Sequence, residues 1–218
     1  TEDKIIAKLR NASPNKKLVV AGCLPLINLK RLKREAKFDG AIGPAPGRRI
    51  VTLMNKIENG EYPLMLKPSA LPPLTLVRYP LVKVTEILPI AYGCLGDCSF
   101  CCVQHARGKL RSYSPEGILN RIERLLEENI QEIWLTAQDL ASYGKDIGTN
   151  LPELLREIIR IKRKFKIRLG MMNPNTTLTI LNDLAEIYSN EKIFKFLHLP
   201  IQSGDNEILE DMNRHYTV

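Results

Sequence analysis

The sequence predicts an α/β protein built from two successive series of strand and helix signals. Short apolar runs alternate with segments of helical periodicity, an order typical of parallel sheets. A stretch rich in proline, residues 62–81, separates the two series. We therefore expect an N-terminal α/β domain over residues 1–61, a linker over 62–81 and a second domain over 82–218.

The first series reads as strand, helix, strand, helix. Residues 17–22 carry the apolar run of a short buried strand, and residues 38–43 form a second candidate strand. Residues 26–37 place leucines on one side and basic residues on the other, and residues 47–59 predict a second helix that ends before Gly60. This βαβα order predicts a small parallel sheet.

The segment over residues 62–81 has a different composition. Proline lacks a backbone N–H, so the prolines of this segment exclude a long helix or a central strand. They are Pro63, Pro68, Pro72, Pro73 and Pro80. We interpret this segment as a linker that ends near Leu81.

A second alternating series follows the linker. The candidate strands are residues 82–89, 132–137, 166–171 and 194–200, and the candidate helices are 115–128, 151–164, 177–189 and 206–212. Ser114 and Pro115 form a good start for the first of these helices, as cap and first-turn residue. Each strand–helix unit spans roughly 30 to 40 residues, which indicates repeated units of barrel type. Four units leave a barrel open, so we expect the natural chain to continue beyond Val218.

Composition favours a soluble globular protein, with 44% hydrophobic and 26% charged residues. No apolar stretch approaches the roughly 18 residues of a membrane helix, and the first residues do not form a signal peptide, so we expect a cytoplasmic protein with no membrane partner. The 32 basic and 24 acidic residues give a net charge of +8, which favours a polyanionic partner such as nucleic acid. An aromatic content of 6% argues against a platform that stacks single-stranded bases.

Four of the five cysteines lie close together, and three of them have the spacing Cys-x3-Cys-x2-Cys. These three are Cys94, Cys98 and Cys101, and Gly93 and Gly96 permit the turns that bring their thiolates together. Three thiolates can hold a cubane iron–sulfur cluster by three of its irons, which leaves the fourth iron open for a small ligand. The spacing therefore predicts a reactive 4Fe–4S cluster.

Two other readings of the cysteines stay open. A structural zinc ion would need a fourth ligand, which Cys102 or His105 could supply. Cys102 adjoins Cys101 and would have to fold back on the same ion, so we expect it instead to be a small buried residue. The cysteines could also be inert and buried.

The cysteine motif directly after the first strand of a βα barrel resembles the radical S-adenosylmethionine (SAM) superfamily. Further motifs resemble its methylthiotransferases, namely His105–Ser112, Trp134–Asp139 with Tyr143–Gly144, His198–Gly204, and Met212–Thr217. Gly170–Pro174 resembles their archaeal and eukaryotic branch. That branch converts N6-threonylcarbamoyladenosine next to the anticodon of tRNA to its 2-methylthio derivative.

This resemblance implies a partial flavodoxin-like α/β domain followed by a partial radical-SAM (β/α) barrel. It implies SAM at the open iron and a second 4Fe–4S cluster in the full-length protein. Cys23, in the Gly22-Cys23 turn, matches the last ligand of that second cluster, whose two other cysteines would lie before Thr1. We therefore expect a chain truncated at both ends and unable to complete methylthiotransfer.

The resemblance also implies binding residues. Phe100 precedes the last cysteine and would lie near the adenine of SAM. Further SAM contacts are expected after the second, third and fourth strands of the barrel, at Gln138, Asp139, Asn173, Gln202 and Ser203. For Gln138, Asp139, Gln202 and Ser203, capping of a helix or loop is the alternative.

Basic residues next to the cysteine motif could face tRNA phosphates. They are Arg107, Lys109 and Arg111, and a solvated loop is the alternative for them. The resemblance also implies an electron donor such as a flavodoxin or a ferredoxin. Competing functions are a methylthiotransferase that acts on isopentenyladenosine in tRNA or on an aspartate of a ribosomal protein, and a zinc-stabilised RNA-binding module without catalysis.

Overall fold

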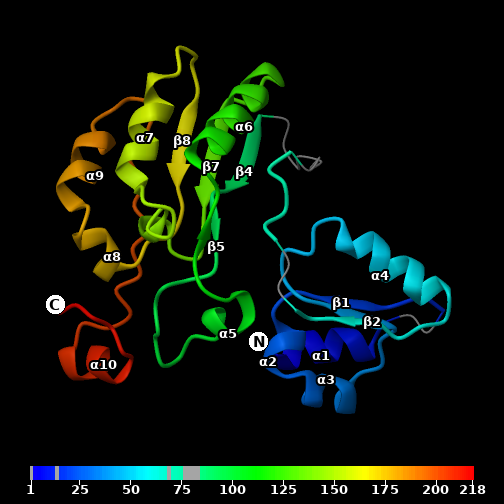
Figure 1. Cartoon of the computed structure of the whole chain (residues 1–218). Coiled ribbons are helices and arrows are strands. Elements are labelled where there is room, and N and C mark those ends of the chain that lie inside the picture. The colour runs from blue at the N-terminus through cyan, green and yellow to red at the C-terminus, as the bar shows by residue number, and fades with distance from the viewer. Residues whose placement is uncertain (1, 13–14, 68–69, 76–83) are drawn as a thin grey trace. The chain divides into compact units, whose positions relative to one another are not determined.

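The computed structural model describes residues 2–12, 15–67, 70–75 and 84–218. The chain divides into two compact units (Figure 1). Unit 1 is formed by Thr1–Pro73 with His105–Gly108, and unit 2 by Leu74–Gln104 with Lys109–Val218. No helix in the described ranges is long and apolar enough to cross a membrane.

Unit 1 contains a three-stranded parallel sheet in the order β1-β2-β3. Its elements are α1 (Glu2–Arg10), β1 (Val19–Ala21), α2 (Leu24–Ile27), α3 (Leu29–Glu35), β2 (Gly40–Ile42), α4 (Arg49–Glu58) and β3 (Leu64–Met65). One apolar cluster gathers Val20, Leu24, Leu32, Ala36, Phe38 and Ala41, and a second gathers Ile42, Leu53 and Ile57. The parallel sheet that the βαβα order predicts is therefore present.

The segment expected to be a linker contributes an edge strand to this sheet. Leu64 pairs with Ala41 in parallel register, and the carbonyl of Pro63 accepts a hydrogen bond of 3.0 Å from the Ala41 N–H. A proline immediately before a short edge strand needs no N–H for the sheet, so it does not oppose this pairing. Residues 68–69 and 76–81 of the segment lie outside the described residues.

The single helix expected over residues 26–37 is wrong, because the chain forms the two short helices α2 and α3 instead. The break falls at Asn28, whose backbone leaves the helical region at φ −146° and ψ 58°. Its side-chain oxygen accepts a hydrogen bond of 3.3 Å from the Arg31 N–H. A side chain that bonds to a nearby N–H favours a new helix start over the interior of a longer helix.

Unit 2 contains the parallel sheet β4-β7-β8, whose strand order follows the chain order. Its strands and their connecting helices are β4 (Thr85–Pro89), α6 (Pro115–Glu127), β7 (Glu132–Thr136), α7 (Leu151–Arg160) and β8 (Lys166–Leu169). Of the expected first strand, Val82 and Lys83 lie outside the described residues. The predicted cap is confirmed, since Ser114 Oγ accepts a hydrogen bond of 3.2 Å from the Gly117 N–H.

One large apolar cluster forms the core of unit 2. It includes residues of the sheet, such as Leu135 and Ile167, and residues of the helices, such as Ile122 and Leu155, all of them fully buried. In Figure 1, α6, α7 and the later helix α9 (Leu181–Tyr188) follow one another around the sheet. This arrangement is that of successive strand–helix units of one sheet.

The fourth strand expected over residues 194–200 does not form. Only Ile193 makes an isolated bridge, to Ile167, and the Phe194 N–H donates to the Ile167 carbonyl at 2.9 Å. The Phe196 N–H bonds to the Phe194 carbonyl at 2.7 Å, so it closes a tight local turn and is not free to pair with β8. The segment therefore follows β8 without a regular ladder.

The helix expected over residues 177–189 is also divided, into α8 (Pro174–Leu178) and α9. The hydroxyls of Thr177 and Thr179 bond to carbonyls three or four residues earlier in the chain. Such bonds satisfy the carbonyls locally and weaken helix continuity. A last helix, α10 (Asn206–Asp211), begins at Asp205, whose side chain caps it.

Four short elements of unit 2 and the cysteine-rich segment had no signal in the sequence. β5 (Ala91–Tyr92) pairs in antiparallel register with β6 (Arg111–Ser112), and α5 (Val103–Arg107) lies between them in the chain. A 3-10 helix, η1 (Leu140–Ser142), follows β7. The β5–β6 pair closes a loop of residues 93–110, here called the cysteine loop, because it contains four of the five cysteines.

Candidate functional site

Hydrogen bonds join the loops at the carboxyl ends of the unit 2 strands. The Gly93 N–H, at the start of the cysteine loop, donates to Gln138 Oε1 after β7 at 2.7 Å. The Asn173 N–H, after β8, donates to Asp139 Oδ1 at 3.0 Å. Because parallel strands end at the same edge of a sheet, residues far apart in sequence meet there. This edge is where we expect the functional site.

The three cysteines predicted as cluster ligands lie in one part of the cysteine loop. The Gly96 N–H donates to Cys94 Sγ at 3.2 Å. A Cβ built on Gly96 would lie 3.4 Å from Cys94 Sγ and 3.8 Å from Cys98 Sγ, so these two thiols flank the same glycine. The Cys101 N–H bonds to the Cys98 carbonyl at 3.0 Å, which keeps the third cysteine in the next turn.

The chemistry of these residues fits an iron–sulfur cluster. All five cysteines are free, and burial raises the pKa of the Cys94 thiol. Among the described residues, no group of three or more His, Cys, Asp or Glu side chains is arranged to hold a metal ion. A cubane cluster attaches each thiolate to a different iron, so its ligands surround a cluster rather than one ion. Three free cysteines of one loop are the donor set that such a cluster takes.

Asp139 is the most deeply buried of the predicted SAM contacts, with 3% of its surface exposed. Its Oδ1 accepts from the Asn173 N–H, and its Oδ2 accepts a hydrogen bond of 2.7 Å from the Thr176 hydroxyl. Burial raises the pKa of Asp139 despite these bonds. Asn173 Oδ1 in turn accepts from the Asn175 N–H at 3.2 Å and caps α8. Both side chains therefore hold the loop after β8, which for Asp139 is the capping role given above as the alternative to SAM contact.

The remaining predicted SAM contacts lie nearer to solvent. Phe100 is 54% exposed in the cysteine loop. Gln202 is exposed and has a positive φ of 67°, and Ser203 Oγ accepts a hydrogen bond of 3.1 Å from the Asp205 N–H. Gln202 and Ser203 form a turn that leads into α10. Contact of these two residues and Phe100 with SAM stays a prediction.

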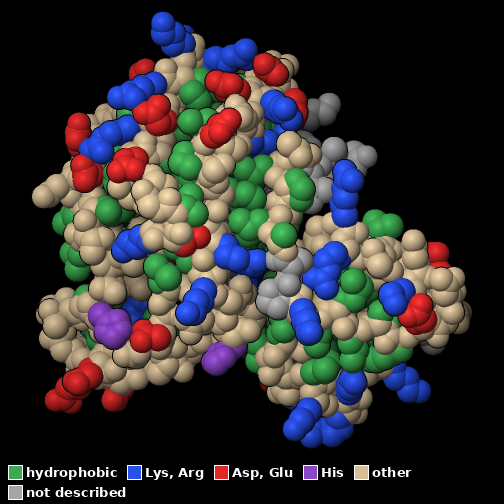
Figure 2. All heavy atoms as spheres, in the orientation of Figure 1, with side chains coloured by type: hydrophobic (Ala, Val, Ile, Leu, Met, Phe, Trp, Pro, Cys, Tyr) green, Lys and Arg blue, Asp and Glu red, His purple; other side chains and the backbone are tan. Residues whose placement is uncertain are grey.

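The basic residues predicted to contact RNA come from the closing part of the cysteine loop. Arg107 ends α5, Lys109 is exposed, and Arg111 lies in β6. On the face shown in Figure 2, Lys and Arg side chains are spread over the surface, with Asp and Glu side chains among them. RNA contact by the three residues stays a prediction.

The other two cysteines have different environments. Cys23 follows Gly22, whose φ is +108°, and occupies the cap position of α2 without a side-chain capping bond. Cys102 was expected to be buried, and this expectation is wrong, because its side chain is exposed. The chain turns into α5 immediately after it, and Ala106 supplies the buried residue there. His105, the other alternative zinc ligand, is also exposed.

The sequence reasoning missed one contact with the predicted ligands. Arg214 Nη1 donates to Cys98 Sγ at 3.2 Å, although the two residues are 116 positions apart in the sequence. The Ser99 N–H donates to the Met212 carbonyl at 3.1 Å beside it. The motif Met212–Thr217 was noted only as part of a family resemblance, and no local pattern connects it to the cysteines.

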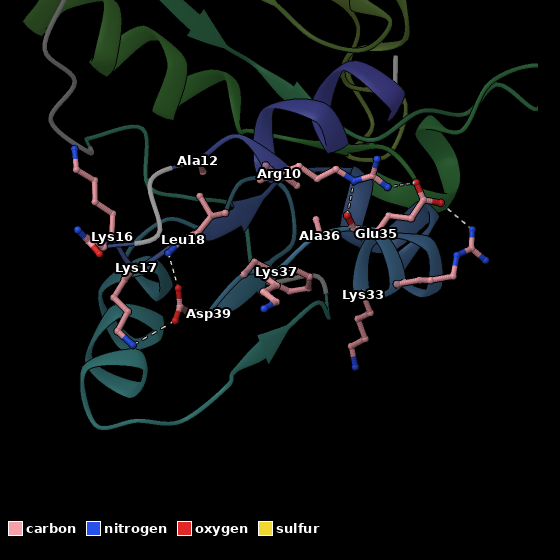
Figure 3. A pocket seen from close by; sticks show the side chains of 14 residues that line it. Arg10, Ala12, Lys16, Lys17, Leu18, Lys33, Glu35, Ala36, Lys37 and Asp39 are labelled. Carbon is pink, nitrogen blue, oxygen red and sulfur yellow. Dashed lines mark hydrogen bonds and ion pairs between the residues drawn. The ribbon is translucent and has the colours of Figure 1, made fainter.

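Unit 1 contains a cavity of about 880 Å³ with a basic lining (Figure 3). Its lining includes Arg10, Lys16, Lys17, Lys33, Arg34 and Lys37, together with Glu35 and Asp39. Glu35 forms ion pairs with Arg10 and Arg34, and Asp39 pairs with Lys17. Hydrogen bonds from Arg34 and Arg31 lower the pKa of Glu35, and the Leu18 N–H is the main cause of the lowered pKa of Asp39. The cavity therefore has an excess of basic groups, half of them paired within it.

Comparison with known proteins gives one family match and a set of relatives. The model of the radical SAM superfamily matches residues 88–218, which is more than half of the chain. A probable threonylcarbamoyladenosine tRNA methylthiotransferase of Pyrococcus horikoshii is 44% identical over 100% of this chain and 52% of its own length. The human threonylcarbamoyladenosine tRNA methylthiotransferase is 34% identical over 94% of this chain and 36% of its own length. The chain thus spans about half the length of the archaeal relatives it matches.

A solved structure with a similar fold is the radical SAM methyltransferase TsrM from Kitasatospora setae, with tryptophan substrate and a SAM analogue bound. It has a TM-score of 0.67 and 14% identity, and it covers 99% of this chain and 48% of its own. A second structure of TsrM, with cobalamin and a 4Fe–4S cluster bound, has a TM-score of 0.65. At this identity the likeness shows the fold alone.

These findings confirm the predicted fold class, a mixed α/β protein with parallel sheets and a radical SAM domain. The flavodoxin-like character of the N-terminal part and the domain boundaries stay predictions. The prediction of an enzyme that uses SAM and a 4Fe–4S cluster is confirmed at the level of the family. The chain belongs to the radical S-adenosylmethionine superfamily.

Proposed function

We propose that the protein carrying this chain is a tRNA methylthiotransferase. Its substrate would be N6-threonylcarbamoyladenosine next to the anticodon, and its product the 2-methylthio derivative. One observation carries this proposal. Relatives with that name, from an archaeon and from human, are 44% and 34% identical along nearly all of this chain, through both of its units.

Cys94, Cys98 and Cys101 would hold the cluster, with SAM at the iron that no cysteine occupies. When bound, the cluster supplies the electron that cleaves SAM and starts radical chemistry. The β5–β6 pair would keep the ends of the cysteine loop together, because it joins residues 91–92 to 111–112. Gln138 would fix the start of the loop through its bond to the Gly93 N–H.

The other loops at the same edge would bind and orient SAM. The proposed contacts are Phe100, Gln138, Asp139, Asn173, Gln202 and Ser203. Because each oxygen of Asp139 already accepts a hydrogen bond within the protein, this residue would also hold the loop after β8 in place. Cys23 would be a ligand of the second 4Fe–4S cluster that the resemblance implies.

Arg107, Lys109 and Arg111 would contact phosphates of the tRNA. The net charge of +8 supports a polyanionic substrate, and these residues lie in the same loop as the cysteines. A flavodoxin or ferredoxin would supply electrons, and the protein would act in the cytoplasm. Weaker tRNA binding by an Arg107→Gln variant, with a smaller dependence on salt, would support the phosphate contact.

Mass spectrometry of nucleosides tests the substrate. The protein carrying this chain is expressed in a host whose tRNA contains N6-threonylcarbamoyladenosine but not its 2-methylthio derivative. We expect that derivative in the digested tRNA, and none with the Cys98→Ala variant. A Cys102→Ala variant is the matched control, since this neighbouring thiol is not assigned to the cluster.

The same digest separates the competing substrates. Appearance of a 2-methylthio group on isopentenyladenosine would replace the proposed substrate with that one. If tRNA stayed unmodified while a ribosomal protein gained the methylthio group, the tRNA proposal would be wrong.

A further inference from the structure

The end of the chain docks on the cysteine loop. We call residues 211–216 the C-terminal segment. Ser99 donates from its N–H to the Met212 carbonyl at 3.1 Å and from its hydroxyl to the Asp211 carbonyl at 2.8 Å. Asn213 Nδ2 donates to the Asp97 carbonyl at 3.1 Å. The segment therefore lies along Asp97–Ser99, the part of the loop that surrounds Cys98.

Within this segment, Arg214 contacts a predicted cluster ligand directly. Its Nη1 donates to Cys98 Sγ at 3.2 Å, and its Nη2 donates to the Pro200 carbonyl at 3.4 Å. Its guanidinium carbon lies 5.3 Å from the centre of the Tyr216 ring, and the Tyr216 hydroxyl bonds to the Ile201 carbonyl. The Pro200 carbonyl and the Tyr216 ring therefore hold the guanidinium in place while it contacts Cys98 Sγ.

One donor of Arg214 has no partner in the described part of the chain. Its Nε is buried and makes no hydrogen bond. A buried donor without a partner is unfavourable, so it calls for a specific explanation such as a ligand or a reactive centre next to it. If Arg214 served only to hold the C-terminal segment in place, a buried and unpaired Nε next to Cys98 would bring no benefit.

We propose that Arg214 is a positioning residue for the iron–sulfur cluster. It fixes Cys98 Sγ and makes the cluster easier to reduce. Hydrogen bonds to ligating sulfurs are among the factors that set the reduction potential of such clusters. A positive group at the sulfur stabilises the additional electron of the reduced state, so it raises the potential. The proposal depends on the cluster of the superfamily and not on tRNA as substrate.

The test compares reduction potentials of the whole chain after anaerobic reconstitution. Electron paramagnetic resonance follows the cluster during a redox titration. We expect Arg214→Gln to have a more negative midpoint potential than the wild type. Arg214→Lys keeps a charged donor, so its midpoint potential should lie between those of the wild type and Arg214→Gln. Ser99→Ala is the matched control, because it removes a docking bond without touching Cys98, and its midpoint should equal that of the wild type.

Iron retention gives a second readout. Loss of a partner behind a metal ligand typically costs about 10- to 100-fold in metal affinity, so we expect Arg214→Gln to lose iron to a chelator at least about tenfold faster. If this variant holds no cluster while Arg214→Lys and Ser99→Ala do, the proposal is supported. A wild-type midpoint in Arg214→Gln, an equal shift in Ser99→Ala, or a wild-type chain that takes up no iron would overturn it.

Discussion

Two turns in this chain have the same local design and different surroundings. Gly22 precedes Cys23 after β1, and Gly93 precedes Cys94 after β5, and both glycines have positive φ, +108° and +80°. Cys23 is the only cysteine in residues 1–73. Cys94 shares its loop with three others. The turn places one thiol at the end of a strand, but the number of thiols that the rest of the loop brings decides what the turn can bind.

The two units also differ in how much apolar surface they bury. Both have a sheet of three parallel strands. In unit 1 the buried residues divide into two small clusters, whereas those of unit 2 form one continuous core between the sheet and its helices. A larger core stabilises a unit more, because the favourable free energy of folding grows with the apolar area removed from water. We therefore expect unit 2 to be the more stable unit.

The largest expected effect separates the two turns. Cys98→Ala should abolish the cluster, since two thiolates of the motif would remain. Cys23→Ala should leave the iron content of this chain unchanged, at roughly four irons per chain. Iron and acid-labile sulfide after anaerobic reconstitution measure both. Equal iron loss in the two variants would show that the turns do not differ in this way.

The next effect separates the two cores. Leu155→Ala in α7 and Leu53→Ala in α4 each remove a fully buried leucine. Each should cost about 2–5 kcal/mol of the stability of its own unit. Trp134 in β7 is the one tryptophan of the chain and reports on unit 2. In urea unfolding followed by its fluorescence, only Leu155→Ala should lower the midpoint. A similar shift with Leu53→Ala would mean that the units unfold together.

Two aspartates, Asp139 in unit 2 and Asp39 in unit 1, should make contributions to stability whose pH dependence has opposite sign. Burial raises the pKa of Asp139 in unit 2 above its ordinary value near 3.8, so its contribution to stability is present below that value and is lost as pH rises through the folded pKa. The Leu18 N–H lowers the pKa of Asp39 in unit 1. Its contribution is present above about pH 3.8 and is lost as pH falls through the folded pKa.

Asparagine variants test this difference. Asp139→Asn should remove the loss of stability that occurs as pH rises from about 3.8, measured by urea unfolding with Trp134 fluorescence. Asp39→Asn should remove part of the acid-induced loss of unit 1, measured by circular dichroism between about pH 2 and 5. Unchanged pH profiles in both variants would contradict the assigned signs.

The smallest effect concerns helix caps. Ser114 caps α6 in unit 2, and Asn28 caps α3 in unit 1. Replacing either with alanine should cost about 1 kcal/mol, because one N–H of the first turn loses its partner. The Trp134 transition should move with Ser114→Ala and stay in place with Asn28→Ala. A shift of equal size for both would again argue against separate unfolding.

Local signals decided which parts of the fold could be predicted. α6 begins where Ser114 and Pro115 indicate, because a cap and a first-turn proline act within a few residues. The helix over residues 26–37 was predicted as one because its apolar spacing is continuous, while the break depends on the conformation of Asn28. The fourth strand was predicted from its apolar residues, but a strand exists only if its N–H groups face a partner, and the Phe196 N–H does not.

The sequence by itself determined the cysteine motif, the order of strands and helices and the family to which the chain belongs. These depend on residue identity and on short spacings, which survive in a linear pattern. Only the tertiary structure decided that Arg214 bonds to Cys98 and that Asp139 holds the loop after β8. Those contacts join residues 116 and 34 positions apart. Asp139 meets the loop after β8 because parallel strands bring their loops to one edge of the sheet, whereas Arg214 reaches Cys98 because the C-terminal segment docks along Asp97–Ser99.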